Sequence, residues 1–516
     1  MVYEVPSLSE QYEREDTFGD ALYDWMGRAP FLAIAFAIHL LAFFLLTAIP
    51  WSTASEDDAV ALETQVVLPP EDDFDEPDEP VFEDPVPDEV EQDDVVFDDP
   101  VIDDSEVESE DENDVDQPES PFSGDQWNDA IGTGGGAGTP GGGSKRHGTR
   151  ATRPEDKHRV NVIAGLQWLA DHQAQDGRWD CDDFMHDSVR PGPVCDGAGD
   201  PAHDVGVTGL AMLAFLGAGI DQKDQGPFGD VVRRGLAWMM REQDRETGLL
   251  GRAIGHDFLY DHSIGTLALT ECLYSDPKNP LLRRSAERAV AYCTQARNPY
   301  GAWRYAVPAN GESDTSVTGW MVFALASARD VGIDVPDADF RDAVAWFDEV
   351  TDPGTGRTGY TERGTASARP EHLQDAYPAE RGEALTAVAM LGRIFAGDVL
   401  GDDSVDRDVL SKGANLLLEK LPNWSDDGAD CDMYYWYYGS YAMFQMASQD
   451  KRAWSAWERA MESAIVPHQR KSPESFDGSW DPIGPWGHAG GRVYSTATMV
   501  LCLEVRYRYG RVLGAR

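Results

Sequence analysis

From about residue 156 to the end of the chain, apolar residues recur with the period of a helix, and polar or Gly-rich loops interrupt the pattern. Six segments share one arrangement, with a polar start, small residues at the fifth and sixth positions, and apolar residues at helical spacing afterwards. Their first residues are Asp204, Asp261, Asp314, Gly382, Tyr435 and Gly491. Consecutive starts lie 53 to 68 residues apart, so the sequence predicts an internal repeat of six helices.

The fifth and sixth positions of the six segments carry small side chains throughout. They are Thr208, Gly209, Gly265, Thr266, Thr318, Gly319, Thr386, Ala387, Gly439, Ser440, Ser495 and Thr496. Small side chains allow neighbouring helices to approach closely. We therefore expect these six helices to pack against one another.

Each segment follows another amphipathic stretch that carries an aromatic residue, as in residues 161–173, 231–243, 284–296 and 340–350. Two helices per repeat make six helical hairpins, which form two layers in a compact domain. Six such hairpins side by side are expected to close into a ring of inner helices surrounded by a ring of outer helices. The sequence predicts an all-α, (α/α)6 toroid over residues 155–516.

The first hairpin contains a specific motif, G-x2-W-L-x3-Q-x3-G-x-W, which runs from Gly165 to Trp179. It resembles the QW repeat of squalene and oxidosqualene cyclases. Partial copies supply Gly235, Trp238, Gln243, Gly248, Gly301, Trp303, Gly478 and Trp480. We expect the Gln to bond backbone at the start of the next helix while the Trp stacks under the turn. The resemblance implies the α/α toroid of terpenoid cyclases and protein prenyltransferase β-subunits, with a ligand cavity at the ring's centre.

The activity signatures of these families fall in the wrong places. Class II cyclases protonate an alkene with a D-x-D-D motif that leads into an inner helix, whereas residues 180–183 lie some twenty residues before the helix near Asp204. Prenyltransferases bind zinc through an Asp-x-Cys pair and a later His. Here residues 430–432 read Asp-Cys-Asp, and Tyr494 stands where the His is expected, so the ligand set for zinc is incomplete.

Several polar and aromatic residues lie at or just before the predicted starts of inner helices, so we expect them at the mouth of the ring. They are Asp204, Asp261, His262, Asp314, Asp432, Tyr434, Tyr435, Arg492 and Tyr494. Asp204, Asp261 and Asp314 suit helix N-caps, and as a group they would instead form a polar rim around a pocket. His262 beside Asp261 is a candidate general base, which makes Asp261, His262 and Asp314 the candidate catalytic residues.

A polar loop between residues 180 and 204 is dense in acidic groups. Asp180, Asp182 and Asp183 are candidate ligands for Ca2+, although the spacing of an EF-hand is absent; the alternative is a solvated acidic loop. Cys181 and Cys195 share this loop and are the best candidates for a disulfide in an oxidising compartment.

The N-terminal third has a different pattern. Residues 31–49 are apolar and free of formal charge, which is about the length that crosses a bilayer, so residues 30–51 are predicted to form one transmembrane helix. Residues 1–29 would be a cytoplasmic tail, since Arg14 and Arg28 precede the helix and no basic residue follows until Lys145. The toroid would then lie outside the cytoplasm, in the periplasm, attached to the inner membrane.

Residues 52–154 are predicted to be a disordered linker, acidic and Pro-rich at first and Gly-rich towards its end. Residues 51–130 hold 32 Asp and Glu, so most of the formal net charge of -51 of the whole chain comes from this linker. Such acidity disfavours nucleic acid as a partner. His39 lies in the middle of the predicted membrane helix, where it would either be tolerated as neutral or bond a partner in the membrane.

Two functional classes remain open. The first is a binding or scaffold module for a hydrophobic, isoprenoid-like ligand or a peptide in the central cavity. The second is a terpenoid cyclase-like or other enzyme that uses the Asp and His residues at the cavity mouth. The missing cyclase and zinc signatures favour the first class.

Overall fold

The computed structural model describes residues 157–255, 257–299, 301–401, 405–508 and 513. All of them belong to one compact unit, Ser109–Arg516. The predicted tail (1–29), transmembrane helix (30–51) and linker (52–154) lie outside the described residues. Among the residues that the structure does describe, no helix has both the length and the apolar character needed to cross a membrane.

The described residues form long helices that alternate between two layers. The inner helices are α4 (Asp204–Gly217), α6 (Phe258–Ser275), α8 (Thr315–Asp330), α10 (Ala384–Leu400), α12 (Met433–Met446) and α14 (Gly487–Leu503). The outer helices are α3 (Arg159–Asp171), α5 (Pro227–Glu242), α7 (Pro280–Gln295), α9 (Asp337–Val350), α11 (Arg407–Glu419) and α13 (Lys451–Ile465).

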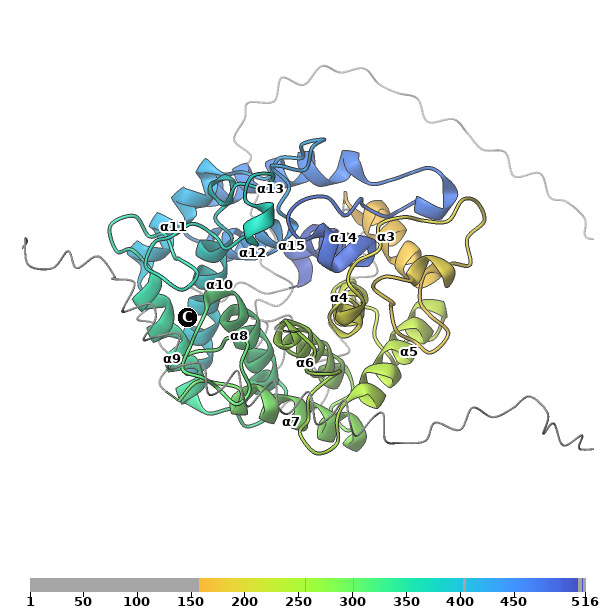
Figure 1. Ribbon diagram of the computed structural model, residues 1–516, viewed down its shortest axis with the longest axis horizontal. Coiled ribbons are helices and arrows are strands. Elements are labelled where there is room, and N and C mark those ends of the chain that lie inside the picture. Colours follow the sequence, from red (N-terminus) through yellow and green to blue (C-terminus); the bar gives the residue numbers. More distant parts are fainter. Residues whose placement is uncertain (1–156, 256, 300, 402–404, 509–512, 514–516) are drawn as a thin grey trace, which may run out of the picture. The chain divides into compact units, whose positions relative to one another are not determined.

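The inner helices form a closed ring. Each inner helix packs against the next, and α14 packs against α4 (Figure 1). The outer helices surround this ring, with each hairpin contributing one helix to each layer. A short helix, α15 (Val505–Arg508), follows α14 and contacts α12. The predicted toroid of six hairpins is confirmed for the described residues.

The two layers differ in burial as their sequences require. In α8 every residue from Thr315 to Ala328 is buried, because this inner helix contacts neighbours on all sides. In α9 the buried residues follow a single stripe, which faces the inner ring. The small residues lie at contacts between inner helices: a Cβ on Gly209 would lie 2.9 Å from Ile264 Cγ2 of α6, and one on Gly319 would overlap Val388 of α10.

The predicted role of the QW glutamine is confirmed. Gln173 Nε2 donates to the carbonyl of Gly177 at 2.8 Å and to that of Val231, in α5, at 3.0 Å. The indole of Trp179 donates to the carbonyl of Leu169 at 2.7 Å. The same amide arrangement occurs at Gln469, which sequence analysis did not single out; it bonds Gly478 and, on the first outer helix, Asn161.

Aromatic side chains of α8, α10 and α12 occupy one side of the lumen, where the cyclase resemblance implies a ligand cavity. Trp320 of α8 stacks on Tyr437 of α12, with ring centroids 5.6 Å apart. Because α10 lies between these two helices in the ring, the two side chains meet on the inner side of α10, within the lumen. Phe323 adds edge contacts with Phe395 of α10 and Tyr438 of α12. Residues 434–438 are all aromatic. Part of this segment therefore occupies the region that was expected to hold a ligand.

Candidate functional site

Asp314 is the central residue of the candidate site. It caps α8, as predicted, because its Oδ1 accepts the amide hydrogen of Val317 at 2.8 Å. Its side chain is 0% exposed, and its Oδ2 lies 4.0 Å from Arg304 Nε and has no hydrogen-bond partner at normal distance among the described residues. The Tyr360 hydroxyl lies near enough to lower the pKa of Asp314. Burial raises the pKa of Asp314 to about 7, although the Val317 amide and the Arg304 charge oppose the shift. A carboxyl group of this kind can accept or donate a proton near neutral pH.

Four half-buried tyrosines surround Asp314, and with it they make up what we call the Asp314–tyrosine cluster. They come from separate parts of the chain: Tyr260, Tyr305, Tyr360 and Tyr434. The hydroxyls of Tyr305 and Tyr360 hydrogen-bond each other. Burial raises the pKa of Tyr305, and the Asp314 charge raises it further, so this hydroxyl stays protonated.

The cluster joins two inner helices, α8 and α12, that are not neighbours in the ring. Tyr434 of α12 bonds Ser316 of α8 through their hydroxyls, which are 2.6 Å apart. The Arg304 guanidinium lies over the rings of Tyr305 and Tyr360, at 5.5 and 5.9 Å from their centroids. The site therefore combines a buried acid, protonated hydroxyls and one cation at the N-terminal end of α8.

Asp261 and Asp204 are not N-caps, which corrects their predicted role. Asp257 precedes α6, so Asp261 lies in the first turn, and Asp204 is the first residue of α4. Asp261 pairs instead with His203, whose Nδ1 lies 3.0 Å from its Oδ2. Burial lowers the pKa of His203, but the hydrogen bond and charge of Asp261 outweigh this effect and raise it to about 9.

His262 bonds backbone through both ring nitrogens. Its Nδ1 accepts the Leu250 amide at 3.0 Å, so its proton sits on Nε2, which donates to the Ala289 carbonyl at 3.0 Å. Burial lowers its pKa to about 4. In other repeats a Thr at the fifth position accepts this loop amide, as Thr208 does from Trp179. His262 takes over that structural role because its repeat has Gly265 at the fifth position.

Asp432, Tyr435 and Arg492, which were also candidates at helix starts, each have a partner within the protein. Asp432 caps α12 and pairs with Arg369, with 2.5 Å between Oδ2 and Nη2. Tyr435 points away from the mouth, because its hydroxyl donates to the Lys420 carbonyl at the end of α11. Arg492 is engaged in holding loops, through Asp481 at 2.7 Å and the carbonyl of Asp196 at 2.9 Å.

The acidic loop gathers a different trio from the one predicted. Carboxylate oxygens of Asp180, Asp182 and Asp204 lie within 4.8 Å of one another, whereas Asp183 bonds His186. Arg178 lies 2.7 Å from Asp180 and 3.2 Å from Asp204. Burial raises the pKa of Asp204 to about 6. The trio is thus partly neutralised by a cation of the chain itself.

The predicted disulfide is not formed. Cys181 and Cys195 are both buried free thiols. Cys181 Sγ lies 3.4 Å from the Ala489 carbonyl, and Cys195 Sγ lies 2.8 Å from the Ser475 carbonyl. Each sulfur therefore packs against a different backbone segment, although the two residues share one loop.

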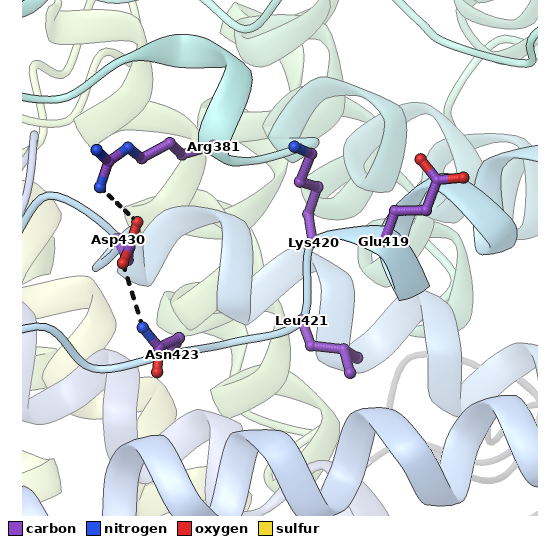
Figure 2. A pocket seen from close by; sticks show the side chains of 6 residues that line it. All are labelled: Arg381, Glu419, Lys420, Leu421, Asn423 and Asp430. Carbon is purple, nitrogen blue, oxygen red and sulfur yellow. Dashed lines mark hydrogen bonds and ion pairs between the residues drawn. The ribbon is translucent and has the colours of Figure 1, made fainter.

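A shallow depression of about 250 Å³ lies elsewhere, beside the end of α11. Figure 2 shows Arg381 bonded to Asp430, and Asp430 bonded to Asn423. The residues that line it are Arg381, Glu419, Lys420, Leu421, Asn423 and Asp430. None of them belongs to the Asp314–tyrosine cluster, and Arg381 and Asp430 already pair with each other.

The comparison with family models gives one match. Residues 147–354 match the model of the squalene-hopene cyclase C-terminal domain. The match spans the first three hairpins and α9, and it supports the predicted likeness to terpenoid cyclases. We call the whole domain of six hairpins, of which the match covers the first part, the cyclase-like toroid. No curated protein matches the sequence.

Two solved structures are similar to this chain at low scores. A cellobiose 2-epimerase from Bacillus thermoamylovorans is 14% identical with a TM-score of 0.46, and the match covers 69% of this chain and 98% of that chain. An α-amylase from Clostridium perfringens is 9% identical with a TM-score of 0.43, covering 67% and 97%. At these scores the likenesses say nothing about what the cyclase-like toroid binds.

Asp314 and Tyr434 were both candidates from the sequence, and the structure brings them together, but three of their neighbours were not expected. Tyr260, Tyr305 and Tyr360 lie in or beside loops of three different repeats. Tyr260 directly precedes Asp261, which is the one local signal that pointed to it. The others are brought to Asp314 by the closure of the cyclase-like toroid.

Proposed function

We propose that the cyclase-like toroid is a binding module that holds an extended peptide at the mouth of the ring. The observation that carries this proposal is the unbonded Oδ2 of Asp314, buried among half-buried tyrosines. A buried polar atom without a partner is costly, so such an atom facing a site favours a ligand group that bonds it. A peptide amide is a donor of the required kind.

The peptide is favoured over an isoprenoid on two grounds. The stacked pair Trp320–Tyr437 fills part of the lumen in which a long hydrocarbon would lie. A hydrocarbon also has no hydrogen to donate to Asp314. The tyrosine rings give apolar contact area and hydroxyls together, which suits a peptide with mixed polarity.

The remaining chain gives this module its setting. We propose that residues 30–51 anchor the protein in the inner membrane and that residues 52–154 hold the toroid away from it, outside the cytoplasm. The proposed anchor rests on the uncharged apolar run 31–49, and the proposed spacing rests on the like charges and prolines that follow. A membrane partner bonded to His39 belongs to the same proposal.

Native mass spectrometry of the full chain, released from its membrane in mild detergent, tests the binding role. Asp314→Asn keeps the cap through its amide oxygen and places a donor where Oδ2 now accepts. Asp450→Asn is the matched control, because Asp450 caps the outer helix α13 away from the mouth. We expect a bound peptide on the wild type and on the control but not on Asp314→Asn. A bound isoprenoid would contradict the proposal.

A second function has support from one observation, the pKa of about 7 for Asp314. A carboxyl group with this pKa would serve as a general acid or base, and the cyclase-like toroid would then be an enzyme. The same experiment separates the two functions. A peptide recovered with unchanged mass after incubation supports the binding module, whereas a shortened or altered one supports the enzyme.

A further inference from the structure

Besides Arg304 Nε, which lies by Asp314, three further hydrogen-bond donors near the mouth are buried and have no partner among the described residues. They are the Nε of Arg369, the Nε1 of Trp486 and the hydroxyl of Tyr494. Folded proteins pair nearly all such groups, so three in one neighbourhood need an explanation. The side chain of Arg369 is 3% exposed, so bulk water does not supply the missing bond.

The three donors lie together although they come from separate segments. The Arg369 guanidinium lies over the Trp486 ring, 5.7 Å from its centroid. Tyr494 follows in α14, eight residues after Trp486, and it lies near enough to Arg369 and Asp432 that both charges affect its pKa. We call Arg369, Trp486 and Tyr494 the donor cluster.

The donor cluster adjoins the Asp314–tyrosine cluster. The ring of Tyr434 lies 6.3 Å from that of Trp486, while its hydroxyl bonds Ser316 beside Asp314. Tyr434 therefore forms part of the boundary between an unbonded acceptor on one side and unbonded donors on the other. One ligand that carries both donors and acceptors would satisfy the two clusters.

The charges of the donor cluster indicate which acceptor it takes. An arginine Nε and an indole nitrogen can only donate, so the ligand atom must be an acceptor. The charge of Arg369 is already balanced by Asp432, which lies 2.5 Å from it. A carboxylate or phosphate would face Asp432 without a free cation to balance it. A neutral carbonyl oxygen meets no such repulsion.

We propose that the donor cluster is a subsite for peptide carbonyl groups. This inference rests on the proposed peptide-binding role and deepens it, because it fixes where the peptide's acceptors lie. Amide hydrogens of the peptide bond Asp314, and carbonyl oxygens bond Arg369, Trp486 and Tyr494 across the boundary at Tyr434. Recognition then depends on the peptide backbone at the donor cluster, not on a charged end of the peptide.

The test uses the full chain labelled with 5-fluorotryptophan and followed by 19F NMR, with Trp486→Phe to assign the Trp486 signal. The probes are N-acetyl-triglycinamide, which offers neutral carbonyls, and acetate, which offers a carboxylate. We expect the amide to shift the Trp486 signal saturably and acetate to leave it in place. Arg369→Lys keeps the charge beside Asp432 but lacks the Nε hydrogen, and Tyr494→Phe lacks the hydroxyl. Each should weaken binding about tenfold.

The outcomes separate this inference from the proposed function. A Trp486 signal that moves with acetate but not with the amide, or that moves with neither, would overturn the carbonyl subsite. So would Arg369→Lys and Tyr494→Phe variants that bind the amide as tightly as the wild type. The 19F NMR test could rule out the carbonyl subsite while native mass spectrometry still finds a peptide on the wild type but not on Asp314→Asn. In that case the proposed function stands and only the subsite is wrong. If the amide binds at Trp486 but no peptide is carried, the subsite stands and the proposed function fails.

Discussion

Trp320 and Tyr437 stack across the ring of inner helices, with ring centroids 5.6 Å apart and 17° between their planes. The two residues belong to α8 and α12, which are separated by α10 in the ring. A toroid with an open lumen would keep these side chains apart. The contact fills part of the lumen, so the proposed ligand site lies at the mouth of the ring.

Replacing Trp320 by alanine should therefore destabilise the fold without adding a useful cavity. Trp320 is 5% exposed and contacts Tyr437 and Tyr438. We expect a loss of about 3 to 5 kcal/mol in the free energy of unfolding, measured by chemical denaturation. Leu281→Ala is the control, because Leu281 is 65% exposed and its loss should change stability by less than about 0.5 kcal/mol. Equal stability of both variants would show that the lumen is not packed.

The QW glutamines predict a second difference in stability. Gln173→Ala leaves the buried carbonyls of Gly177 and Val231 without their donor. We expect a loss of about 2 kcal/mol in denaturant unfolding. Gln167→Ala, on the same helix, removes only an exposed bond to Asp171 and should cost about 0.5 kcal/mol or less. A similar cost for the two variants would remove the link between the motif and the closure of successive hairpins.

Stability should fall between pH 7 and pH 9 because of His203. Its pKa in the folded protein is about 9, above the ordinary 6.5, so protonation favours the folded state. The contribution is complete below pH 6.5 and is lost as the pH rises through 9. We expect the wild type to lose about 1 to 2 kcal/mol over this range in denaturation experiments. His203→Gln should show a flatter profile, and an unchanged slope in this variant would disprove the His203–Asp261 pairing.

The acidic loop makes a prediction about Ca2+. Arg178 lies between Asp180 and Asp204, where a metal ion would otherwise balance the carboxylates. We expect millimolar Ca2+ to leave the melting temperature of the toroid unchanged in the wild type. Arg178→Ala should make the melting temperature rise with Ca2+, because the trio of Asp180, Asp182 and Asp204 then lacks a cation. A rise in the wild type would show that Ca2+ displaces Arg178.

The helices and their order could be predicted because they depend on local pattern. Thr208, Gly209 and their equivalents mark where inner helices meet, and this signal repeats in every hairpin. Gln173 and Trp179 act within one hairpin and the next, so their contacts could also be predicted from the sequence. The exact helix starts were harder, because a turn with Pro201 moves the N-cap of α4 from Asp204 to His203.

The site depends on relationships that the chain does not express locally. Tyr260 and Tyr360 come from neighbouring repeats and meet Asp314 only in the folded domain, so no spacing in the sequence signals them. Tyr305 precedes Asp314 by nine residues in the loop before α8, but nothing in that loop marks it as a site residue. His262 looked like a base because it adjoins Asp261. Its actual partners, Leu250 and Ala289, are backbone groups of a loop and a helix that sequence alone does not place. The disulfide between Cys181 and Cys195 failed for the same reason, since nearness in sequence did not bring the sulfurs together.

Photocrosslinking at the mouth tests the central claim most directly. The full chain would carry p-benzoylphenylalanine at Tyr360, inside the Asp314–tyrosine cluster, or at Leu281 on the outer helix α7 as a control. After irradiation in intact cells, mass spectrometry would identify what is attached to each position. A peptide joined at position 360 and not at 281 is the result that we predict. An isoprenoid lipid joined at position 360, or no product there at all, would contradict a peptide-binding mouth.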